Sequence, residues 1–288
     1  MDESDFIVPE KHLPRGIAER IDDPPAVPAV ARPAATVVLM RDAAAGLEVL
    51  LLKRVHNAGF VPGAYVFPGG RVDRGDADPA ILRLTLSLTP EGAARRMGLR
   101  QADPPAAAYY LAALREAFEE TGILVGRGRG GDPLPTAAVA PTVLDARNRI
   151  LDEVCSFYQA LEELGARLDD AAMEYIGHWI TPIEEPRRYD ARFFAAAVAP
   201  DAEPAIHAAE VLEAIWVRPI EALRRTRDGS LPMVFPTVKT LESMTPFATT
   251  AEVLGAFRER SVPSVLPRLI RTADGIRLRI PEIISDSD

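Results

Sequence analysis

The chain has 288 residues, of which 48% are hydrophobic, and a formal net charge of −9. This length and composition fit a globular protein with one large domain or two small ones. The negative charge argues against broad attraction to nucleic acid or to an anionic membrane, so we expect neither partner. A single cysteine, Cys155, excludes an internal disulfide framework. The polar, acidic N-terminus and the lack of a long apolar run favour a cytoplasmic protein.

The first 33 residues are rich in proline and predict an irregular N-terminal arm. Two apolar runs follow, ATVVLM (35–40) and LEVLLLKR (47–54), and they predict two strands joined by a hairpin-like turn. The next segment, 59–75, contains five glycines around a strand-like AYVF. It predicts a loop that needs positive φ angles or a close approach between backbones.

The clearest predicted helix follows this loop after a gap. Asp103 suits its N-cap, Pro104 and Pro105 suit its first turn, and Gly122 sits where a C-cap belongs. Apolar residues recur between these limits at helical spacing, namely Tyr110, Leu111, Leu114, Ala117 and Phe118.

The rest of the chain mixes strand and helix patterns. A short strand is predicted at ILV (123–125), a helix over 142–165, and strands at HWITP (178–182) and RFFAAAVA (192–199). VLEAIWVRPIEAL (211–223) predicts a strand that runs into a short helix. Because no βαβ unit repeats, the order favours an α+β layered sandwich over a doubly wound sheet.

The predicted long helix ends in an unusual group of charges, LREAFEETG (114–122). Glu116, Glu119 and Glu120 fall within two turns and share one face. Like charges at this spacing destabilise a bare helix, whereas a divalent cation such as Mg²⁺ would turn them into a binding site. Arg115 can hold Glu119 from four residues earlier. A solvated acidic face is the alternative, but the glycine-rich loop upstream favours the metal site.

FPGGRVDRGD (67–76) followed by REAFEETGI (115–123) resembles the Nudix box. Gly70 matches the first glycine of that motif, and its second half is matched in full. Two features depart from the family pattern. Asp76 stands where the family has Glu, and 38 residues separate it from Arg115 where the family has seven, an insertion of 31. Long insertions in surface loops are thermodynamically tolerable.

Segments outside the box, such as HWITP, RRYDARFF and FPTVKTLESM, resemble the Nudix subgroup that contains the peroxisomal coenzyme A diphosphatases. The resemblance implies a Nudix-type α/β/α sandwich with a mixed β-sheet and a helical C-terminal extension. It divides the chain into the irregular arm (1–33), a Nudix hydrolase domain (34–228) with an insertion at 77–103, and an extension packed on that domain (229–288). The chain ends in SDSD, so we expect no peroxisomal import.

The implied activity is hydrolysis of a pyrophosphate bond in a nucleotide-type small molecule, with Mg²⁺ or Mn²⁺ as cofactor and coenzyme A or an acyl derivative as the favoured substrate. In this hypothesis Glu116 and Glu120 are direct metal ligands, Glu119 bridges or orients a second metal, and the carbonyl of Gly70 completes the site. ADP-ribose, NADH and oxidised nucleotides are alternative substrates. A Nudix-fold module that binds a nucleotide without cutting it is an alternative of another class.

The general base stays open between one of the helix glutamates and two later carboxylates, Glu210 and Glu213. His207 is interpreted as a surface imidazole. Basic residues near the glycine loop or on the strands are candidates for binding the substrate phosphates, namely Lys53, Arg54, Arg71, Arg74 and Arg192.

Two further segments, GRGRGG and IRLRIPEII, have patterns that need an interpretation. GRGRGG (126–131) formally fits a dinucleotide-binding motif, but the prolines that follow it do not open a helix, so we interpret it as a surface loop. IRLRIPEII near the C-terminus predicts a strand that docks on the body or on a second subunit, which leaves a homodimer open.

Overall fold

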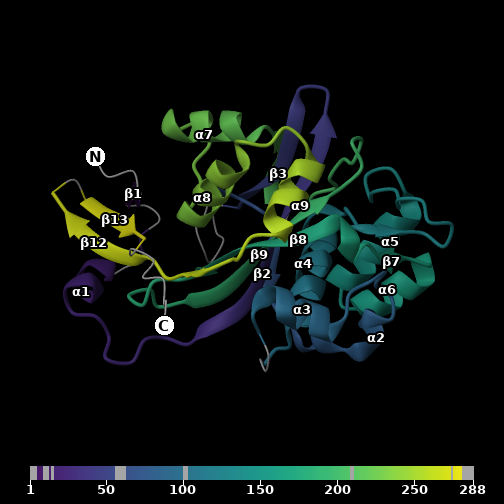
Figure 1. The fold of residues 1–288 in the computed structure, drawn as a ribbon, viewed down its shortest axis with the longest axis horizontal. Helices are drawn as coiled ribbons and strands as arrows, with labels where there is room; N and C mark the ends of the chain where they lie inside the picture. The colour runs from purple at the N-terminus through teal and green to yellow at the C-terminus, as the bar shows by residue number, and fades with distance from the viewer. Residues whose placement is uncertain are drawn as a thin grey trace.

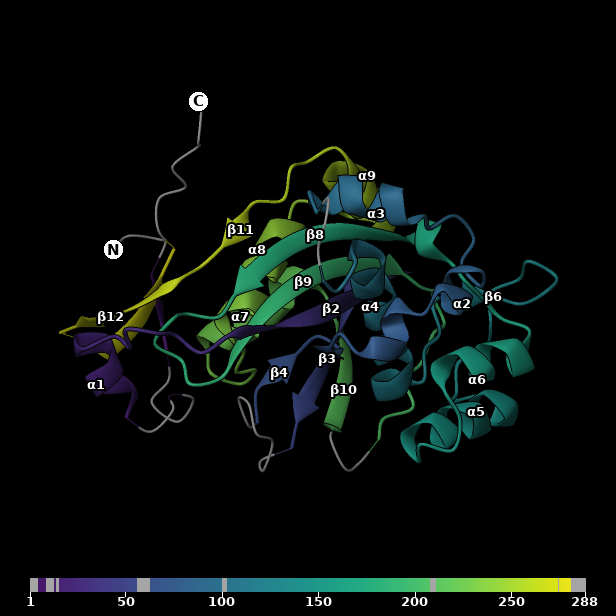
Figure 2. The same cartoon turned by 90° about the horizontal axis from the view of Figure 1, so that it is seen from below.

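The computed structural model describes residues 5–8, 13, 16–55, 63–99, 103–207, 211–273 and 275–280. These residues form an eight-stranded sheet with helices on both faces, and a small three-stranded sheet formed by residues near the two chain ends (Figure 1). In the perpendicular view of Figure 2 the small sheet again lies at one end of the molecule, with α5 and α6 at the other end. The molecule is therefore elongated along the direction that joins the two.

The large sheet has the strand order β10-β3-β2-β9-β8-β11, with β4 paired to β3 and β5 paired to β2. Its strands are β2 (Ala31–Ala43), β3 (Gly46–Arg54), β4 (Tyr65–Val66), β5 (Gly69–Arg71), β8 (Met173–Ile180), β9 (Arg188–Ala197), β10 (Val211–Val217) and β11 (Ser264–Val265). β2 runs parallel to β9 and β11 runs parallel to β8, whereas the other pairs are antiparallel. The sheet is mixed, as predicted.

Helices pack on each face of this sheet. The first face carries α2 (Pro79–Leu82), α3 (Pro90–Met97), α4 (Ala106–Thr121), α5 (Pro141–Leu151) and α6 (Phe157–Leu164), and the second carries α7 (Pro219–Arg227), α8 (Phe235–Met244) and α9 (Thr250–Arg258). Val37 of β2 belongs to the core on the α4 side and Val38 to the core on the other side. Because both faces are covered, the strand is apolar at successive positions. The predicted α/β/α sandwich is confirmed.

No described helix is both long and apolar enough to cross a bilayer.

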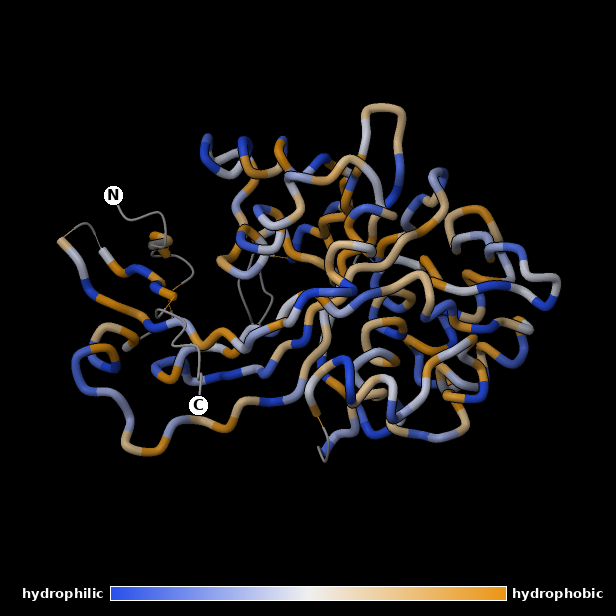
Figure 3. Tube along the Cα trace, in the orientation of Figure 1, coloured by the Kyte–Doolittle hydropathy of each residue, from blue (hydrophilic) through white to orange (hydrophobic). Residues whose placement is uncertain are grey.

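The three-stranded sheet joins the two ends of the chain. It has the order β1 (Asp5–Ile7), β13 (Gly275–Arg279) and β12 (Arg268–Thr272), with α1 (Ile17–Asp22) beside β12. The sequence of β13, GIRLR, alternates between apolar and charged residues (Figure 3), and its most buried residue is Arg277, between the half-buried Ile276 and Leu278. Phe6 also packs on Phe235 of α8, with 5.4 Å between the ring centroids. The arm is therefore not wholly irregular, because β13 supplies a partner that the arm's own sequence does not reveal.

Two more predicted elements differ from the structure. The single helix expected over 142–165 is two helices, because the chain breaks at Glu153, where φ is 56°, and restarts at Ser156, whose hydroxyl accepts a hydrogen bond from the Gln159 N–H at 3.2 Å. ILV (123–125) is not a strand but is buried in the core on the α4 side. The strand begins afterwards, as β6 (Gly126–Arg127), which pairs with β7 (Arg167–Leu168). The short 3₁₀ helices are η2 (Arg74–Ala77) and η3 (Asp170–Ala172).

The insertion is folded onto the body through Arg96 of α3. Its Nε donates to Glu174 Oε1 on β8 at 2.5 Å, and its Nη2 donates to the carbonyls of Tyr175 at 2.8 Å and Phe257 at 2.6 Å. Nη1 donates to the carbonyl of Arg260 at 3.2 Å. One side chain therefore ties the insertion to the sheet and to the end of α9.

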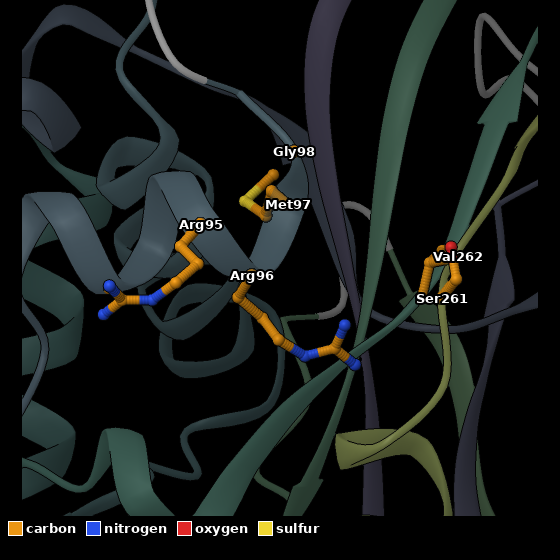
Figure 4. Close-up of a pocket in the computed structure, with 7 residues that line it drawn as sticks. Arg95, Arg96, Met97, Gly98, Ser261 and Val262 are labelled. Carbon is orange, nitrogen blue, oxygen red and sulfur yellow. The ribbon is translucent and has the colours of Figure 1, made fainter.

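Arg96 and its neighbour Arg95 give a matched test of this link. Both line a cleft of about 580 Å³ between α3 and residues 261–262, and Figure 4 shows Arg96 directed toward that segment and Arg95 pointing away. We expect Arg96→Met to lower the free energy of unfolding by roughly 2 kcal/mol, because the carboxylate of Glu174 is only 7% exposed and would lose its closest partner. Urea denaturation measures this, and an equal loss in Arg95→Met would contradict it.

Candidate active site

α4 is buried along its length except at its charged end. The positions that are not buried are Arg115, Glu116, Glu119 and Glu120. Gly122 ends the helix with φ at 68°, and its N–H donates to the carbonyl of Phe118 at 2.8 Å, so the predicted C-cap is confirmed. The packed apolar residues fix the helix, and the charged group is the part that faces out of the core.

Arg115 and Asp76 close the interrupted motif in space. The guanidinium donates to both carboxylate oxygens of Asp76, from Nε at 2.8 Å and from Nη2 at 3.0 Å. The side chain of Asp76 is 1% exposed, and its Oδ2 also accepts from the backbone N–H of Asp73 at 2.8 Å. Asp76 is therefore directed at Arg115, which explains how the shorter carboxylate is accommodated at this position.

Arg115 also holds two of the glutamates. Its Nη1 donates to Glu116 Oε1 at 3.0 Å and to Glu119 Oε2 at 2.9 Å, and its Nη2 donates to the carbonyl of Arg71 at 3.0 Å. Together with the Asp76 fork, these contacts use all five N–H donors of the guanidinium. Burial alone would lower the pKa of Arg115. The hydrogen bond to Asp76 and the charges of the nearby glutamates outweigh this effect and raise the pKa above its usual range. Arg115 is a permanent cation at the centre of the group.

The two glycines of β5 contact the other side of the glutamates. A Cβ on Gly70 would overlap Oε1 of Glu116, so a larger residue there would displace this carboxyl group. The N–H of Gly69 donates to Glu120 Oε2 at 3.1 Å. The glycine loop and the helix therefore meet as the motif predicts.

The electrostatics of this group suit a divalent cation. Burial raises the pKa of Glu116 to about 7 against the opposing effect of Arg115, and the charge of Glu119 adds to the rise. Burial also raises the pKa of Glu119. Among the described residues no three acidic, histidine or cysteine side chains are arranged closely enough to hold a metal ion as they stand. The donor types, carboxylates beside a glycine carbonyl, fit Mg²⁺ or Mn²⁺, and a cation would offset the charge that Arg115 leaves uncompensated.

Arg147 of α5 supports the group from behind, and the sequence analysis missed it. The residue is 2% exposed, and it donates from Nε to the carbonyl of Glu119 at 2.8 Å and from Nη2 to the carbonyl of Glu120 at 3.2 Å. Carbonyls in the last turn of a helix lack partners within the helix, and a cation there is favoured by the helix dipole. Arg147 follows the buried Val143 by four residues, so the two share one face of α5. This spacing could have indicated that Arg147 faces inward.

Lys53 and Glu213 lie away from the glutamates. Lys53 Nζ is 4.0 Å from Glu213 Oε2, and the hydroxyl of Tyr65 donates to the same oxygen at 2.7 Å. Burial and the bond to Glu213 raise the pKa of Tyr65 to about 12. Tyr65 belongs to the core covered by α7 and α8, on the opposite face from α4. The structure therefore does not bring Glu213 to the helix carboxylates as a base or ligand, and Glu210 lies outside the described residues.

The remaining basic candidates divide by exposure. Arg71 and Arg74 are exposed beside the glycine loop. Arg192 is 6% exposed and is engaged internally, because its Nη1 donates to the hydroxyl of Tyr175 at 3.1 Å and its Nε lies 3.3 Å from Asp190 Oδ1. Arg71 and Arg74 are therefore open to solvent at the loop, whereas Arg192 belongs to a buried polar network.

A family model described as the NUDT19 Nudix domain matches residues 26–244. The chain belongs to this family. It is 28% identical over 272 residues to the acyl-coenzyme A diphosphatase NUDT19 of Gallus gallus, covering 81% of this chain and 71% of that protein. The Homo sapiens protein of the same name is 27% identical over 282 residues, covering 85% and 74%.

A solved structure agrees with this assignment. The NUDIX hydrolase from Alicyclobacillus acidocaldarius superposes with a TM-score of 0.66 at 30% sequence identity, covering 79% of this chain and 96% of that one. Both the Nudix fold and the resemblance drawn from the box are therefore confirmed. Members of the Nudix family typically depend on divalent metals.

Asp76 and Asp73 test the central ion pair. We expect Asp76→Asn to lower the free energy of unfolding by roughly 2–4 kcal/mol, because it leaves the guanidinium of Arg115 without its buried counter-charge. Asp73→Asn should cost less than about 1 kcal/mol, since its carboxylate is 61% exposed and 3.9 Å from Arg115 Nη2. Thermal and urea unfolding of both variants measure the difference, and equal losses would contradict it.

Arg147 and Arg149 test the support behind the helix. Arg147→Met should weaken Mn²⁺ binding about tenfold, since the carbonyls of Glu119 and Glu120 lose the group that fixes them. Arg149→Met, which removes an exposed pair with Glu163, should leave Mn²⁺ affinity unchanged. Electron paramagnetic resonance of free Mn²⁺ measures both. Unaltered Mn²⁺ affinity in a folded Arg147→Met would show that the contact serves stability alone.

Proposed function

We propose that this protein is a divalent-metal-dependent pyrophosphatase that hydrolyses coenzyme A or acyl-coenzyme A. The observation that carries the proposed reaction is the cluster in which Arg115, held by Asp76, gathers the helix glutamates beside Gly70. The substrate is supported by the names of the relatives, which match over more than four-fifths of this chain.

The reaction is attack of water on one phosphorus of the pyrophosphate. Glu116, Glu119, Glu120 and the carbonyl of Gly70 would hold Mg²⁺ or Mn²⁺, which neutralises the phosphates and lowers the pKa of water. A helix glutamate accepts the proton as the water oxygen bonds to phosphorus. The bond to the bridging oxygen breaks, and the products carry two separate phosphate groups. Coenzyme A would give 4′-phosphopantetheine and adenosine 3′,5′-bisphosphate.

The roles of the chain's own residues follow from their contacts. Arg115 sets the direction of Glu116 and Glu119, and Gly69 sets that of Glu120. Glu116 lies against the glycine loop, and burial raises its pKa to about 7 when no cation is bound. The general base is one of the helix glutamates, namely one that the metal ions leave free.

A substrate screen tests the proposal. The protein is assayed with Mg²⁺ or Mn²⁺ against coenzyme A, acyl-coenzyme A, ADP-ribose, NADH and dinucleoside polyphosphates. We expect turnover of coenzyme A compounds, and a loss of roughly 100-fold or more in Glu120→Gln, which removes a charged ligand while keeping an oxygen for the Gly69 N–H. Glu91→Gln, an exposed position on α3, is the control and should keep full activity.

Each outcome discriminates between hypotheses. Turnover of ADP-ribose with coenzyme A untouched would overturn the substrate and leave the chemistry standing. If neither the native protein nor Glu120→Gln hydrolysed any pyrophosphate compound, the enzyme hypothesis would be wrong. The alternative, a nucleotide-binding module without catalytic activity, would then be favoured. Calorimetric binding of the same compounds would then identify its ligand.

A further inference from the structure

We propose that Arg54 and His207 form a subsite that binds a phosphate group of the substrate, beside the metal-binding end of α4. This inference rests on the proposed function and deepens it, because it names the protein groups that meet the part of the pyrophosphate which the metal ligands leave free. The interpretation of His207 as a surface imidazole is revised accordingly.

Both side chains present buried nitrogens that no described residue satisfies. Within the described part of the chain, Arg54 Nε and His207 Nδ1 are buried and have no hydrogen-bond partner. An unmade hydrogen bond at a buried polar group is costly, and more so when the group is charged. A guanidinium fork matches a phosphate in shape and charge, and an imidazole N–H can donate to the same group. The missing partner is therefore an anion with several acceptor oxygens.

Strand alternation places Arg54 on the face that carries the glutamates. Leu50 and Leu52 of β3 belong to the core on the α4 side, whereas Leu51 belongs to the opposite core. Arg54 follows in the same alternation as Leu52, so its side chain lies on the α4 side. Lys53 lies on the other side, where it meets Glu213. Two adjacent basic residues of one strand are thus separated by the sheet.

Backbone contacts place His207 between the end of α4 and Arg54. The N–H of Ala205 donates to the carbonyl of Thr121 at 2.8 Å, directly after Glu120 in the chain. The N–H of Val211 donates to the carbonyl of His207 at 3.0 Å, and Val211 is the strand partner of Arg54. Residues 205–207 therefore run from the glutamate end of α4 to the start of β10, alongside the last residue of β3.

The glutamates of α4 and the guanidinium of Arg54 carry opposite charges, and a pyrophosphate can interact with both. The glutamate side binds the substrate through a cation, while Arg54 supplies positive charge directly. In a chain with a formal net charge of −9, a local cation is needed wherever a phosphate is bound without a metal. The ligand class of the subsite is the phosphate of a nucleoside diphosphate derivative.

Kinetics of Arg54→Met and Lys53→Met test the subsite, because each variant keeps the length of the stem and removes one charge. We expect Arg54→Met to raise KM for the turned-over substrate about 10- to 100-fold with Mn²⁺ affinity unchanged, and Lys53→Met to change KM less than about 3-fold. His207→Gln should raise KM by a smaller factor than Arg54→Met, and Arg54→Lys should restore part of the loss. Equal KM changes in Arg54→Met and Lys53→Met would overturn the proposal.

Equilibrium binding separates this proposal from the proposed function. Titration calorimetry with inorganic pyrophosphate in the presence of Ca²⁺ uses the native protein and the same variants. Weaker binding by Arg54→Met than by Lys53→Met would support the subsite even if the native protein turned over no substrate. Normal turnover with equal pyrophosphate binding in both variants would overturn the subsite and leave the proposed function intact.

Discussion

The ion pair between Asp76 and Arg115 is the interaction on which the candidate site depends. Asp76 lies on one side of the insertion and Arg115 on the other, so their contact joins two halves of a motif that the sequence separates by 38 residues. With Asp76 on one edge of the guanidinium, Nη1 is directed at Glu116 and Glu119. The buried carboxylate thereby acts on the glutamates through Arg115, and the shorter side chain at position 76 is sufficient because it never has to reach a metal ion itself.

Burial of α4 turns that ion pair into a rigid site. The apolar residues of the helix pack between the sheet and α5, so the charged end cannot rotate away from β5. Arg147 fixes the carbonyls of Glu119 and Glu120 from one side, and Gly69 fixes the carboxylate of Glu120 from the other. Burial disfavours the charge of Glu116 and raises its pKa to about 7, and the neighbouring charge of Glu119 adds to this rise. The packing of α4 thus fixes the positions of these carboxylates before any ligand binds.

Local patterns predicted the parts of the site that are contiguous in sequence. The helix, its Gly122 cap and the shared face of the glutamates follow from periodicity and spacing, and the glycine loop follows from composition. Contacts between elements that are distant in the sequence could not be predicted from such local patterns. Alternation on β3 shows that Lys53 and Arg54 point to opposite sides, but only the position of α4 decides which one joins the glutamates. The position of Glu213, one of the carboxylates left open for the base, depends on the same packing, since it accepts from Tyr65 of the opposite core. β1 stayed hidden because its partner lies at the other end of the chain.

The insertion contacts β8, the end of α9 and α4, and it therefore has a structural role beyond that of a tolerated loop. Through Arg96 it binds β8 and the carbonyl end of α9, while α3 packs against α4. The packing of α9 is therefore linked to α4 through α3 as well as through the sheet. Because Asp76 and Arg115 flank the insertion, any force that moves α3 acts on the ends of the segment that their ion pair closes. The insertion is for this reason one of the elements that connect α9 to α4, beside β2 and β9, which contact both helices.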